Sequence, residues 1–265
     1  MPKDRYVIEA LARGMEALAL FTRETPHLSL GDVTASLGCT KSMAYRILST
    51  LEVSGYLTYD QTTRRYCPTV RVLELGFTAI HALGLRENAR PLLEALVQAV
   101  GETVSLAVLS QGRVLYLERI HNRAIVGIML GVGSQVPAHA TALGKVLLAG
   151  LTRAECEQQL ALQPLQALTP NTLTDREALL AELEKVRRQG YAVDDEELAP
   201  GLRAVAAPVY DEHGHVVAAI NITGATTTIT HERIETELAP ALIATAHAIS
   251  RALGFAGRAH VGAPG

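Results

Sequence analysis

The sequence lacks three features that would place it in a specialised class of protein. No apolar run approaches the roughly 20 residues that a membrane-spanning helix needs. The first residues, MPKDRYVIEALARG, carry charges where a secretory signal peptide has its apolar segment. Three cysteines (Cys39, Cys67, Cys156) are odd in number and form no CxxC pair, which argues against a disulfide framework and a zinc site. We therefore expect a soluble cytoplasmic protein without a metal.

Charge is also scarce, and it is unevenly distributed. Charged residues make up 19% of the 265 residues and hydrophobic residues 48%, which is typical of a globular chain long enough for two domains. The formal net charge of −3 argues against wholesale binding of polyanions. Residues 40–71, however, hold five basic side chains against two acidic ones, a local charge of +3. A modest basic region in an acidic protein suits a DNA-binding module that reads sequence.

Three amphipathic segments open the chain. Residues Val7–Leu20 place apolar side chains at spacings of three and four, as an amphipathic helix does. A second helix is expected in HLSLGDVTASLG, where Ser29 can serve as N-cap, Asp32 lies three residues on and Gly38 ends the segment. A third helix is expected in CTKSMAYRILSTLEVSG, with Thr40 as its N-cap.

The period of the pattern then changes. The segment GYLTYDQTTRRYCP predicts two short β-segments around a turn at residues 60–63, with Pro68 as the stop. Two helices, a tight turn, a third helix and a hairpin follow one another in a winged helix-turn-helix. In that arrangement the third helix lies in the DNA major groove and the hairpin, called the wing, contacts the DNA backbone. We expect this domain over residues 1–70.

The predicted third helix carries hydrogen-bond donors on its first turns and an apolar stripe along its length. The stripe consists of Met43, Ile47, Leu48 and Leu51. We expect the donors to contact phosphates and base edges, and the wing arginines to contact the backbone. The candidate DNA-binding residues are Thr40, Lys41, Ser42, Tyr45 and Arg46 in the helix, with Arg64 and Arg65 in the wing. Taken alone, a helix with Lys and Arg at its start is more often solvated surface, so the interpretation depends on the whole constellation.

The rest of the chain predicts an α+β domain. Residues 69–90 are apolar-periodic with no proline until Pro91, so we expect a linker helix over 71–90 and a further domain over 91–265. Strand pairs are expected in ETVSLAVLSQGRVLYLERI and in LRAVAAPVYDEHGHVVAAINITG, and another strand in AIVGIMLGVGSQV. Helices are expected after Pro137, after a cap at Thr174, and in HERIETELAPALIATAHAISRALG. Strand pairs covered by helices make an α+β domain around an antiparallel sheet.

Three segments resemble the isocitrate lyase regulator (IclR) family of bacterial transcription factors. They are YRILSTLEVSGYL, PAHATALGKVLLA and GYAVDDEELAPGLRAVAAPVYDEHGHVVAAINITG, and the resemblance runs from about Val7 to Gly254. It implies a winged-helix domain, a linker helix and a C-terminal effector-binding domain with a GAF-like, profilin-like sheet. It also implies dimers or tetramers on double-stranded operator DNA, contact with RNA polymerase, and a small organic acid effector. It implies neither a catalytic activity nor a cofactor.

The same resemblance implies an effector pocket. Its backbone amides fall at Ala142 and Leu143, its aspartate at Asp194, and two polar side chains on one strand face at Asn221 and Thr223. A carboxylate at the start of a helix gains from free N–H groups and from the helix dipole, which makes the implied chemistry reasonable.

Two positions of the implied pocket depart from the family pattern. Ala204 stands where members that bind glyoxylate or pyruvate carry a cysteine, and Asn221 replaces a serine with a larger side chain that both donates and accepts. One polar group of the pocket is therefore missing and another is changed. We expect a larger or aromatic acid rather than a very small oxoacid.

Other motifs point to weaker alternatives. ALGKV resembles a phosphate loop, but His139 stands where a glycine is needed and Val146 replaces the Ser/Thr. The turn DEHGH brings His213 and His215 together, which could clip a metal but is more often solvated. Two rival functions stay open: an enzyme that uses the C-terminal pocket, and a ligand-binding protein that has lost DNA recognition.

Overall fold

A computed structural model describes residues 7–22, 25–82, 84–121 and 130–257 of the chain. The backbone contacts divide it into two units, Met1–Ala82 and Leu83–Gly265, which are described separately below. The strand expected in AIVGIMLGVGSQV falls largely on residues 122–129, which lie outside the described residues.

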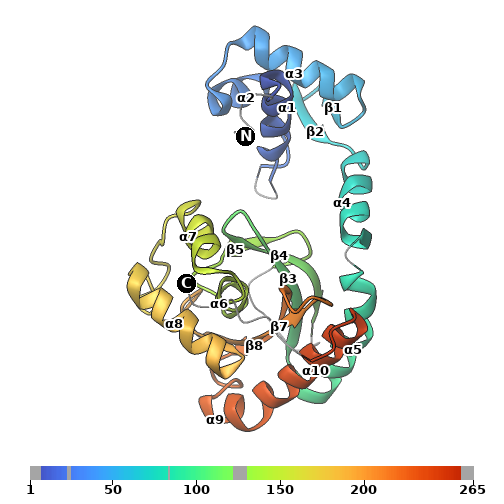
Figure 1. Cartoon of the computed structure of the whole chain (residues 1–265). Coiled ribbons are helices and arrows are strands. Elements are labelled where there is room, and N and C mark those ends of the chain that lie inside the picture. Colours follow the sequence, from blue (N-terminus) through green and yellow to red (C-terminus); the bar gives the residue numbers. More distant parts are fainter. Residues whose placement is uncertain (1–6, 23–24, 83, 122–129, 258–265) are drawn as a thin grey trace. The chain divides into compact units, whose positions relative to one another are not determined.

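The first unit has the element order expected of a winged helix-turn-helix. Its elements are α1 (Glu9–Ala19), α2 (Leu30–Leu37), α3 (Lys41–Val53), β1 (Leu57–Asp60) and β2 (Arg65–Pro68) (Figure 1). The predicted caps of α2 and α3 are confirmed, whereas α1 begins at Glu9 and not at Val7. Ser29 and Asp32 form a capping box at the start of α2, Gly38 ends α2 in the left-handed region, and the Thr40 hydroxyl accepts a hydrogen bond from the Met43 amide.

The core of the first unit explains which face of α3 is free. The buried apolar side chains are Ala17, Leu28, Val33, Ala44, Leu48, Leu57 and Tyr66. Ile47 and Leu51 pack against this cluster, as predicted, but Met43 is 36% exposed. The expectation that Met43 belongs to the buried stripe is wrong, because the small residue Ala44 takes the buried position on that turn.

The wing is a two-stranded antiparallel hairpin, with Leu57 opposite Pro68 and Asp60 opposite Arg65. Asp60 organises the turn, because its carboxylate accepts hydrogen bonds from the Thr62 amide and the Thr63 hydroxyl. These hydrogen bonds hold the pKa of Asp60 below its usual value.

The predicted linker is interrupted. It consists of α4 (Arg71–Ala82), and the next helix, α5 (Leu85–Val100), starts before Pro91 and continues through it. The break lies at Gly84, which adopts the left-handed conformation at φ 56°. The linker helix therefore does not run unbroken to residue 90, and Pro91 does not mark its end, because a proline inside α5 removes one backbone hydrogen bond without ending the helix here.

The second unit is built on one six-stranded antiparallel sheet in the order β5-β4-β3-β8-β7-β6. Its strands are β3 (Thr103–Ser110), β4 (Arg113–Ile120), β5 (Gln135–Pro137), β6 (Ala192–Asp195), β7 (Leu202–Tyr210) and β8 (Val216–Ala225). The predicted Gln-Gly turn joins β3 to β4, with positive φ at both Gln111 and Gly112. The predicted α+β architecture with an antiparallel sheet is confirmed.

Helices cover both faces of this sheet. One of them is α5, which packs on β3 and β4. The others are α6 (Ala142–Ala149), α7 (Arg153–Ala161), α8 (Arg176–Gln189), α9 (His231–Arg233), the π-helical turn η2 (Ile234–Leu238) and α10 (Ala239–Ala252). Helix α6 packs on β7, β8 and α8, whereas α10 lies beside α5 and packs on β7 (Figure 1). The predicted cap of α8 is displaced by one residue: Asp175, rather than Thr174, accepts the hydrogen bond from Ala178, because its carboxylate is the one at the N-cap position.

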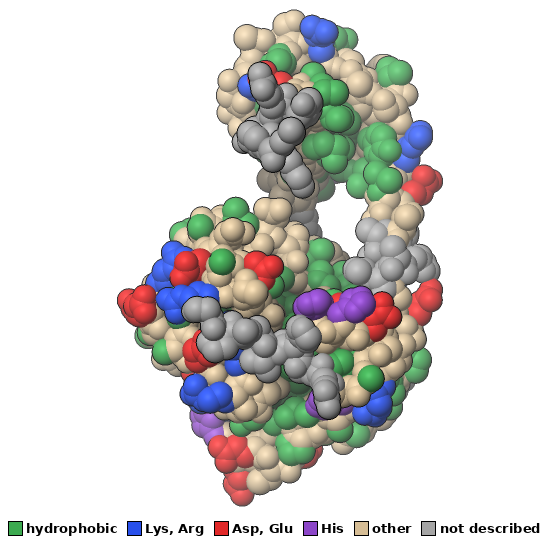
Figure 2. Space-filling model, viewed as in Figure 1, with side chains coloured by type: hydrophobic (Ala, Val, Ile, Leu, Met, Phe, Trp, Pro, Cys, Tyr) green, Lys and Arg blue, Asp and Glu red, His purple; other side chains and the backbone are tan. Residues whose placement is uncertain are grey.

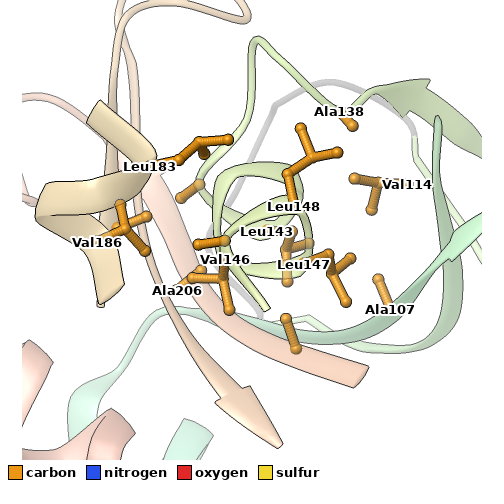
Figure 3. Close-up of a cluster of buried hydrophobic side chains, with 14 of the residues drawn as sticks. Ala107, Val114, Ala138, Leu143, Val146, Leu147, Leu148, Leu183, Val186 and Ala206 are labelled. Carbon is orange, nitrogen blue, oxygen red and sulfur yellow. The ribbon is translucent and has the colours of Figure 1, made fainter. Parts of the chain in front are cut away.

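Helix α6 is buried along its whole length at the centre of the unit. Its apolar side chains meet those of α8 and of the sheet, with Leu143, Val146 and Leu147 among the residues that Figure 3 labels. A Cβ atom on Gly144 would lie 2.0 Å from the Ala138 carbonyl oxygen, so only glycine allows this close approach. The start of α6 is thereby held against the strand that precedes it.

Within the described ranges, no helix is both long and apolar enough to cross a membrane.

Candidate functional site

The N-terminal turns of α3 present polar side chains to solvent. Thr40, Lys41, Ser42, Tyr45 and Arg46, all predicted to contact DNA, are exposed. Ser42, Tyr45 and Arg46 lie at spacings of three and four, so they share one face of the helix, away from the buried Ala44. Tyr45 is 58% exposed although it is a large aromatic side chain, and such a residue is available for contact with a partner.

The two wing arginines are exposed but differ in their contacts. Arg65 donates a hydrogen bond to the His27 carbonyl at 2.9 Å and lies 3.8 Å from the Asp32 carboxylate. Arg64 adopts the left-handed conformation at φ 55°, at the end of the turn. Arg65 therefore ties the wing to α2, whereas Arg64 has the freer side chain for a phosphate.

On α7 and α8, basic side chains are paired with acidic ones, unlike the exposed basic side chains at the start of α3. Ion pairs join Arg153 to Glu157 on α7, and Arg187 to Glu184 on α8. On the face shown in Figure 2, acidic and basic side chains lie next to one another over these helices. Such alternation is typical of a solvated surface and not of a site for a polyanion.

A cavity of about 220 Å³ lies inside the second unit, between α6, the sheet and the loop that joins β6 to β7. Five of the six residues that the sequence suggested for an effector pocket line this cavity: Ala142, Asp194, Ala204, Asn221 and Thr223. Leu143 does not line it, and its side chain points into the hydrophobic cluster (Figure 3).

Strand pairing places the polar residues of the cavity in two rows across the sheet. The Asp194 row runs from Asp194 on β6 through Ala204 on β7 and Thr223 on β8 to Thr103 on β3. Residues paired in this way point to the same face of a sheet, with Cβ atoms about 4.5–5.5 Å apart.

The second row lies two residues further along the strands. This Arg119 row runs from Arg119 on β4 through Ser105 on β3 to Asn221 on β8. The two rows share one face because side chains two apart on a strand point the same way.

Asp194 is 1% exposed, and its carboxylate accepts hydrogen bonds from the amides of Glu197 at 2.8 Å and Leu198 at 3.3 Å. Burial raises the pKa of Asp194 to about 7, with a further increase from the Glu197 charge, although these hydrogen bonds and Lys145 oppose the rise. The carboxyl group therefore changes its charge in the physiological range.

The loop after β6 forms one wall of the cavity through Leu198, Ala199, Pro200 and Gly201. The segment 169–172 forms hydrogen bonds with this loop. The Thr169 hydroxyl donates to the Glu196 carbonyl and the Thr172 hydroxyl to the Glu197 carbonyl, both at 2.7 Å. The wall is therefore hydrogen-bonded to the body of the unit.

Sequence reasoning missed four polar residues that line the cavity: Thr103, Tyr116, Arg119 and Thr141. The Arg119 side chain is half-buried, and its guanidinium lies 5.5 Å from the centre of the Tyr116 ring. The sequence signal that could have identified Arg119 was a basic residue near the end of the apolar strand RVLYLERI. Only the strand register places Arg119 in the same row as Asn221.

The structure explains the two motifs that resembled a phosphate loop and a metal-binding turn. His139 is 2% exposed, and its Nε2 lies 3.0 Å from the Gln166 carbonyl oxygen, which ties it to a neighbouring segment. The amides of His213 and His215 donate to Asp211, which closes the β7–β8 turn. Across the part of the chain that the structure describes, no group of three or more His, Cys, Asp or Glu side chains is placed to hold a metal ion.

Comparison with known proteins covers both units. The model of the IclR helix-turn-helix domain matches residues 10–61, and the model of the bacterial transcriptional regulator IclR C-terminal domain matches residues 77–251. The chain belongs to the IclR family of transcriptional regulators. The resemblance found in the sequence is thus confirmed.

Two relatives of this IclR-family regulator extend over most of its length. The HTH-type transcriptional regulator XynR of Escherichia coli (strain K12) is 32% identical over 252 residues, which cover 94% of this chain and 98% of XynR. The Pca regulon regulatory protein of Pseudomonas putida is 32% identical over 242 residues, covering 91% of this chain and 82% of that protein. Both relatives are named as regulators and not as enzymes, in agreement with the expectation that the chain is not an enzyme.

Solved structures of family members share the fold of this regulator. An IclR family transcriptional regulator from Brucella abortus superimposes with a TM-score of 0.81 at 26% identity, covering 95% of each chain. An IclR homologue from Microbacterium hydrocarbonoxydans, solved in complex with 4-hydroxybenzoate, gives a TM-score of 0.77 at 28% identity and covers 92% of this chain and 98% of that one.

Proposed function

We propose that this IclR-family regulator binds operator DNA through α3 and the wing, and that a small organic acid in the cavity of the second unit alters that binding. The observation that carries the effector part is the cavity itself, which polar side chains from β3, β4, β6 and β8 line beside the start of α6. A few convergent polar groups in an otherwise apolar pocket are typical of a small-molecule site.

The proposed DNA contacts follow from exposure and charge. Lys41 and Arg46 are exposed on α3 and Arg64 is exposed in the wing, so all three can reach phosphates or base edges. Thr40, Ser42, Tyr45 and Arg65 complete the proposed interface.

An acid is favoured as the effector because a cationic side chain and the N-terminus of a helix both lie at the cavity. Arg119 lines the cavity, and Ala142, the first residue of α6, lines it too. Ala204 leaves room where a larger side chain would project, which favours an aromatic or larger acid. The complex of the Microbacterium hydrocarbonoxydans homologue with 4-hydroxybenzoate supports an aromatic acid as the first candidate.

The assembly and partners follow from the family. We propose a homodimer or tetramer on double-stranded DNA, contact with RNA polymerase when the regulator activates, and a cytoplasmic location where bacterial operator DNA is found. Neither a cofactor nor a bound metal is part of the proposal.

A thermal-shift screen against aliphatic and aromatic acids tests the effector site. A ligand that binds only the folded protein raises stability by about 2.7 kcal/mol at 100 times its dissociation constant, which is readily detected. We expect a shift from one chemical class of acid, abolished when Asn221 and Thr223 are both replaced by Ala. A shift that persists in the double variant would place the ligand outside this cavity.

A footprint on the DNA upstream of the protein's own gene separates the regulator from the two rival functions. An enzyme would turn over the acid, and a ligand-binding protein without DNA recognition would leave no protected region. We expect protection of the upstream DNA and no turnover of any acid that gives a thermal shift.

A further inference from the structure

The Arg119 row contains three buried side-chain atoms that have no hydrogen-bond partner among the described residues. They are Arg119 Nε, Ser105 Oγ and Asn221 Oδ1. Arg119 pairs with Ser105 across β3 and β4, and Ser105 pairs with Asn221 across β3 and β8. The three side chains are therefore neighbours on one face of the sheet.

Unpartnered buried polar groups are rare in native proteins, because each has lost its hydrogen bonds to water without replacement, so a row of three needs an explanation. Asn221 is 4% exposed and lines the cavity, and Arg119 lines it as well. Ser105 is fully buried between them in the row. A ligand in the cavity that bonds to Arg119 and Asn221 would supply partners for the two of these atoms whose residues line it.

The charge at Arg119 identifies one end of that ligand. Burial lowers the pKa of Arg119, and the Tyr116 side chain opposes this shift through its charge and a hydrogen bond. No carboxylate of the described residues contributes to the shift. An arginine remains protonated in proteins, and its planar fork matches a carboxylate. The ligand should therefore bring its carboxylate to Arg119.

The Asp194 row identifies the other end. Asp194 is the second charged side chain that lines the cavity, and it comes from β6, which is separated from β4 by three strands. A second carboxylate beside Asp194 would be repelled, whereas a hydroxyl can donate to its carboxylate or bond to Thr223 and Thr103 of the same row. The cavity of about 220 Å³ limits the ligand to a small molecule.

We infer that the effector is a small hydroxy acid, that Arg119 binds its carboxylate beside Asn221, and that its hydroxyl lies on the Asp194 row. This inference rests on the proposed function and adds the residue that selects an acid over a neutral analogue. In this arrangement the carboxylate of the ligand pairs with the full charge of Arg119 on β4. The start of α6 is a secondary contact, since a helix terminus carries only about half a charge.

The test compares acids with their amides in the full-length protein. The probes are 4-hydroxybenzoate, mandelate and 4-hydroxybutyrate, each with its primary amide, and benzoate as the analogue without a hydroxyl. Binding is measured by calorimetry for the wild type and for Arg119→Gln, Arg119→Lys and Arg113→Gln. Arg113 is the matched control, because it lies on the same strand and does not line the cavity.

We expect the wild type to bind at least one hydroxy acid more tightly than its amide. Arg119→Gln should bind the acid about tenfold or more weakly while keeping its affinity for the amide, because only the charge-assisted pair is removed. Arg119→Lys should retain part of the preference, since it keeps the charge without the fork. Arg113→Gln should behave as the wild type.

Four results would overturn the inference, two with Arg119→Gln and two with the wild type. Arg119→Gln could bind the acid as tightly as the wild type, or weaken the acid and the amide by the same factor, which would indicate a merely structural role. A wild type that binds none of the hydroxy acids, or prefers benzoate, also contradicts it. The proposed function fails separately, if the Asn221/Thr223 double variant binds the acid as tightly as the wild type. If that variant no longer binds an acid that Arg119→Gln still binds with wild-type affinity, the cavity remains the effector site and only the role of Arg119 is wrong.

Discussion

Lys145 on α6 donates a hydrogen bond to the Glu197 carboxylate in the loop that walls the cavity, and both side chains are buried. The same ammonium donates to the Val193 carbonyl at 2.9 Å. Glu197 in turn donates its amide to Asp194. The start of the buried helix, the strand β6 and the cavity wall are therefore joined through one buried ion pair.

Removing one member of this pair should destabilise the second unit. Lys145→Met leaves the Glu197 carboxyl buried without its cation, and the expected decrease in the free energy of unfolding is about 3–5 kcal/mol. The double variant Lys145→Met/Glu197→Gln should recover much of this decrease, because neither charge remains. Urea denaturation of the two single variants and the double variant measures the coupling, and strictly additive effects would show that the pair is not a unit.

Asp194→Asn should change how stability depends on pH. Since the native pKa is raised to about 7 from an unfolded value of 3.8, the native state holds a proton that the unfolded chain releases. Stability from this group is complete below pH 3.8 and is lost as the pH rises towards 7, by about 1.4 kcal/mol per pH unit at most.

The Asn side chain does not titrate but can still accept hydrogen bonds from the amides of Glu197 and Leu198. We therefore expect the variant to gain stability relative to the wild type between pH 5 and 7. Lys145 and Glu197 also act on this carboxyl group, so Glu197→Gln serves as the reference for their contribution. Parallel stability profiles for Asp194→Asn and the wild type would contradict the raised pKa.

Arg46→Ala should weaken operator binding by about 1–3 kcal/mol if Arg46 contacts a guanine edge. Because Arg46 is exposed on the free face of α3, we expect the variant to unfold at the same urea concentration as the wild type. Fluorescence anisotropy with an upstream DNA fragment gives the affinity, and Arg153→Ala on α7 is the control for removal of a surface charge. Equal affinities for Arg46→Ala and the wild type would remove Arg46 from the interface.

The wing arginines should make operator affinity depend on salt. Removing a side chain that binds one phosphate should reduce the slope of log affinity against log salt by about 1. We expect this reduction for Arg64→Ala with unchanged stability. Arg65→Ala should also lower stability, because Arg65 donates to His27 and lies near Asp32. A salt titration with the same slope in Arg64→Ala and the wild type would exclude Arg64 as a phosphate ligand.

Local signals in the sequence were sufficient for much of the fold. The capping box of Ser29 and Asp32 and the left-handed Gly38 are encoded within a few residues, and the structure has them. The linker helix was predicted to run as far as Pro91, but it breaks earlier. The left-handed conformation of Gly84, and not the missing amide of the proline, decides where the helix breaks. The predicted burial of Met43 is wrong because the spacing of apolar residues alone does not distinguish two adjacent positions on a helix, and Ala44 is the buried one.

The site depends on contacts that are distant in the sequence. Asn221 and Thr223 share a face by simple alternation, which the sequence predicts. Arg119 joins them only through the pairing of β4 with β3 and of β3 with β8. The raised pKa of Asp194 likewise depends on burial by segments far along the chain. Neither property follows from a local pattern.

The most direct test of an effector-controlled regulator is the operator affinity of the full-length protein, measured with and without an acid that gives a thermal shift. We predict that the acid changes the dissociation constant for operator DNA in the wild type. We also predict that the Asn221/Thr223 double variant binds the DNA normally and no longer responds. An acid that binds the cavity and leaves DNA affinity unchanged, or a double variant that still responds, would contradict control of DNA binding through this cavity.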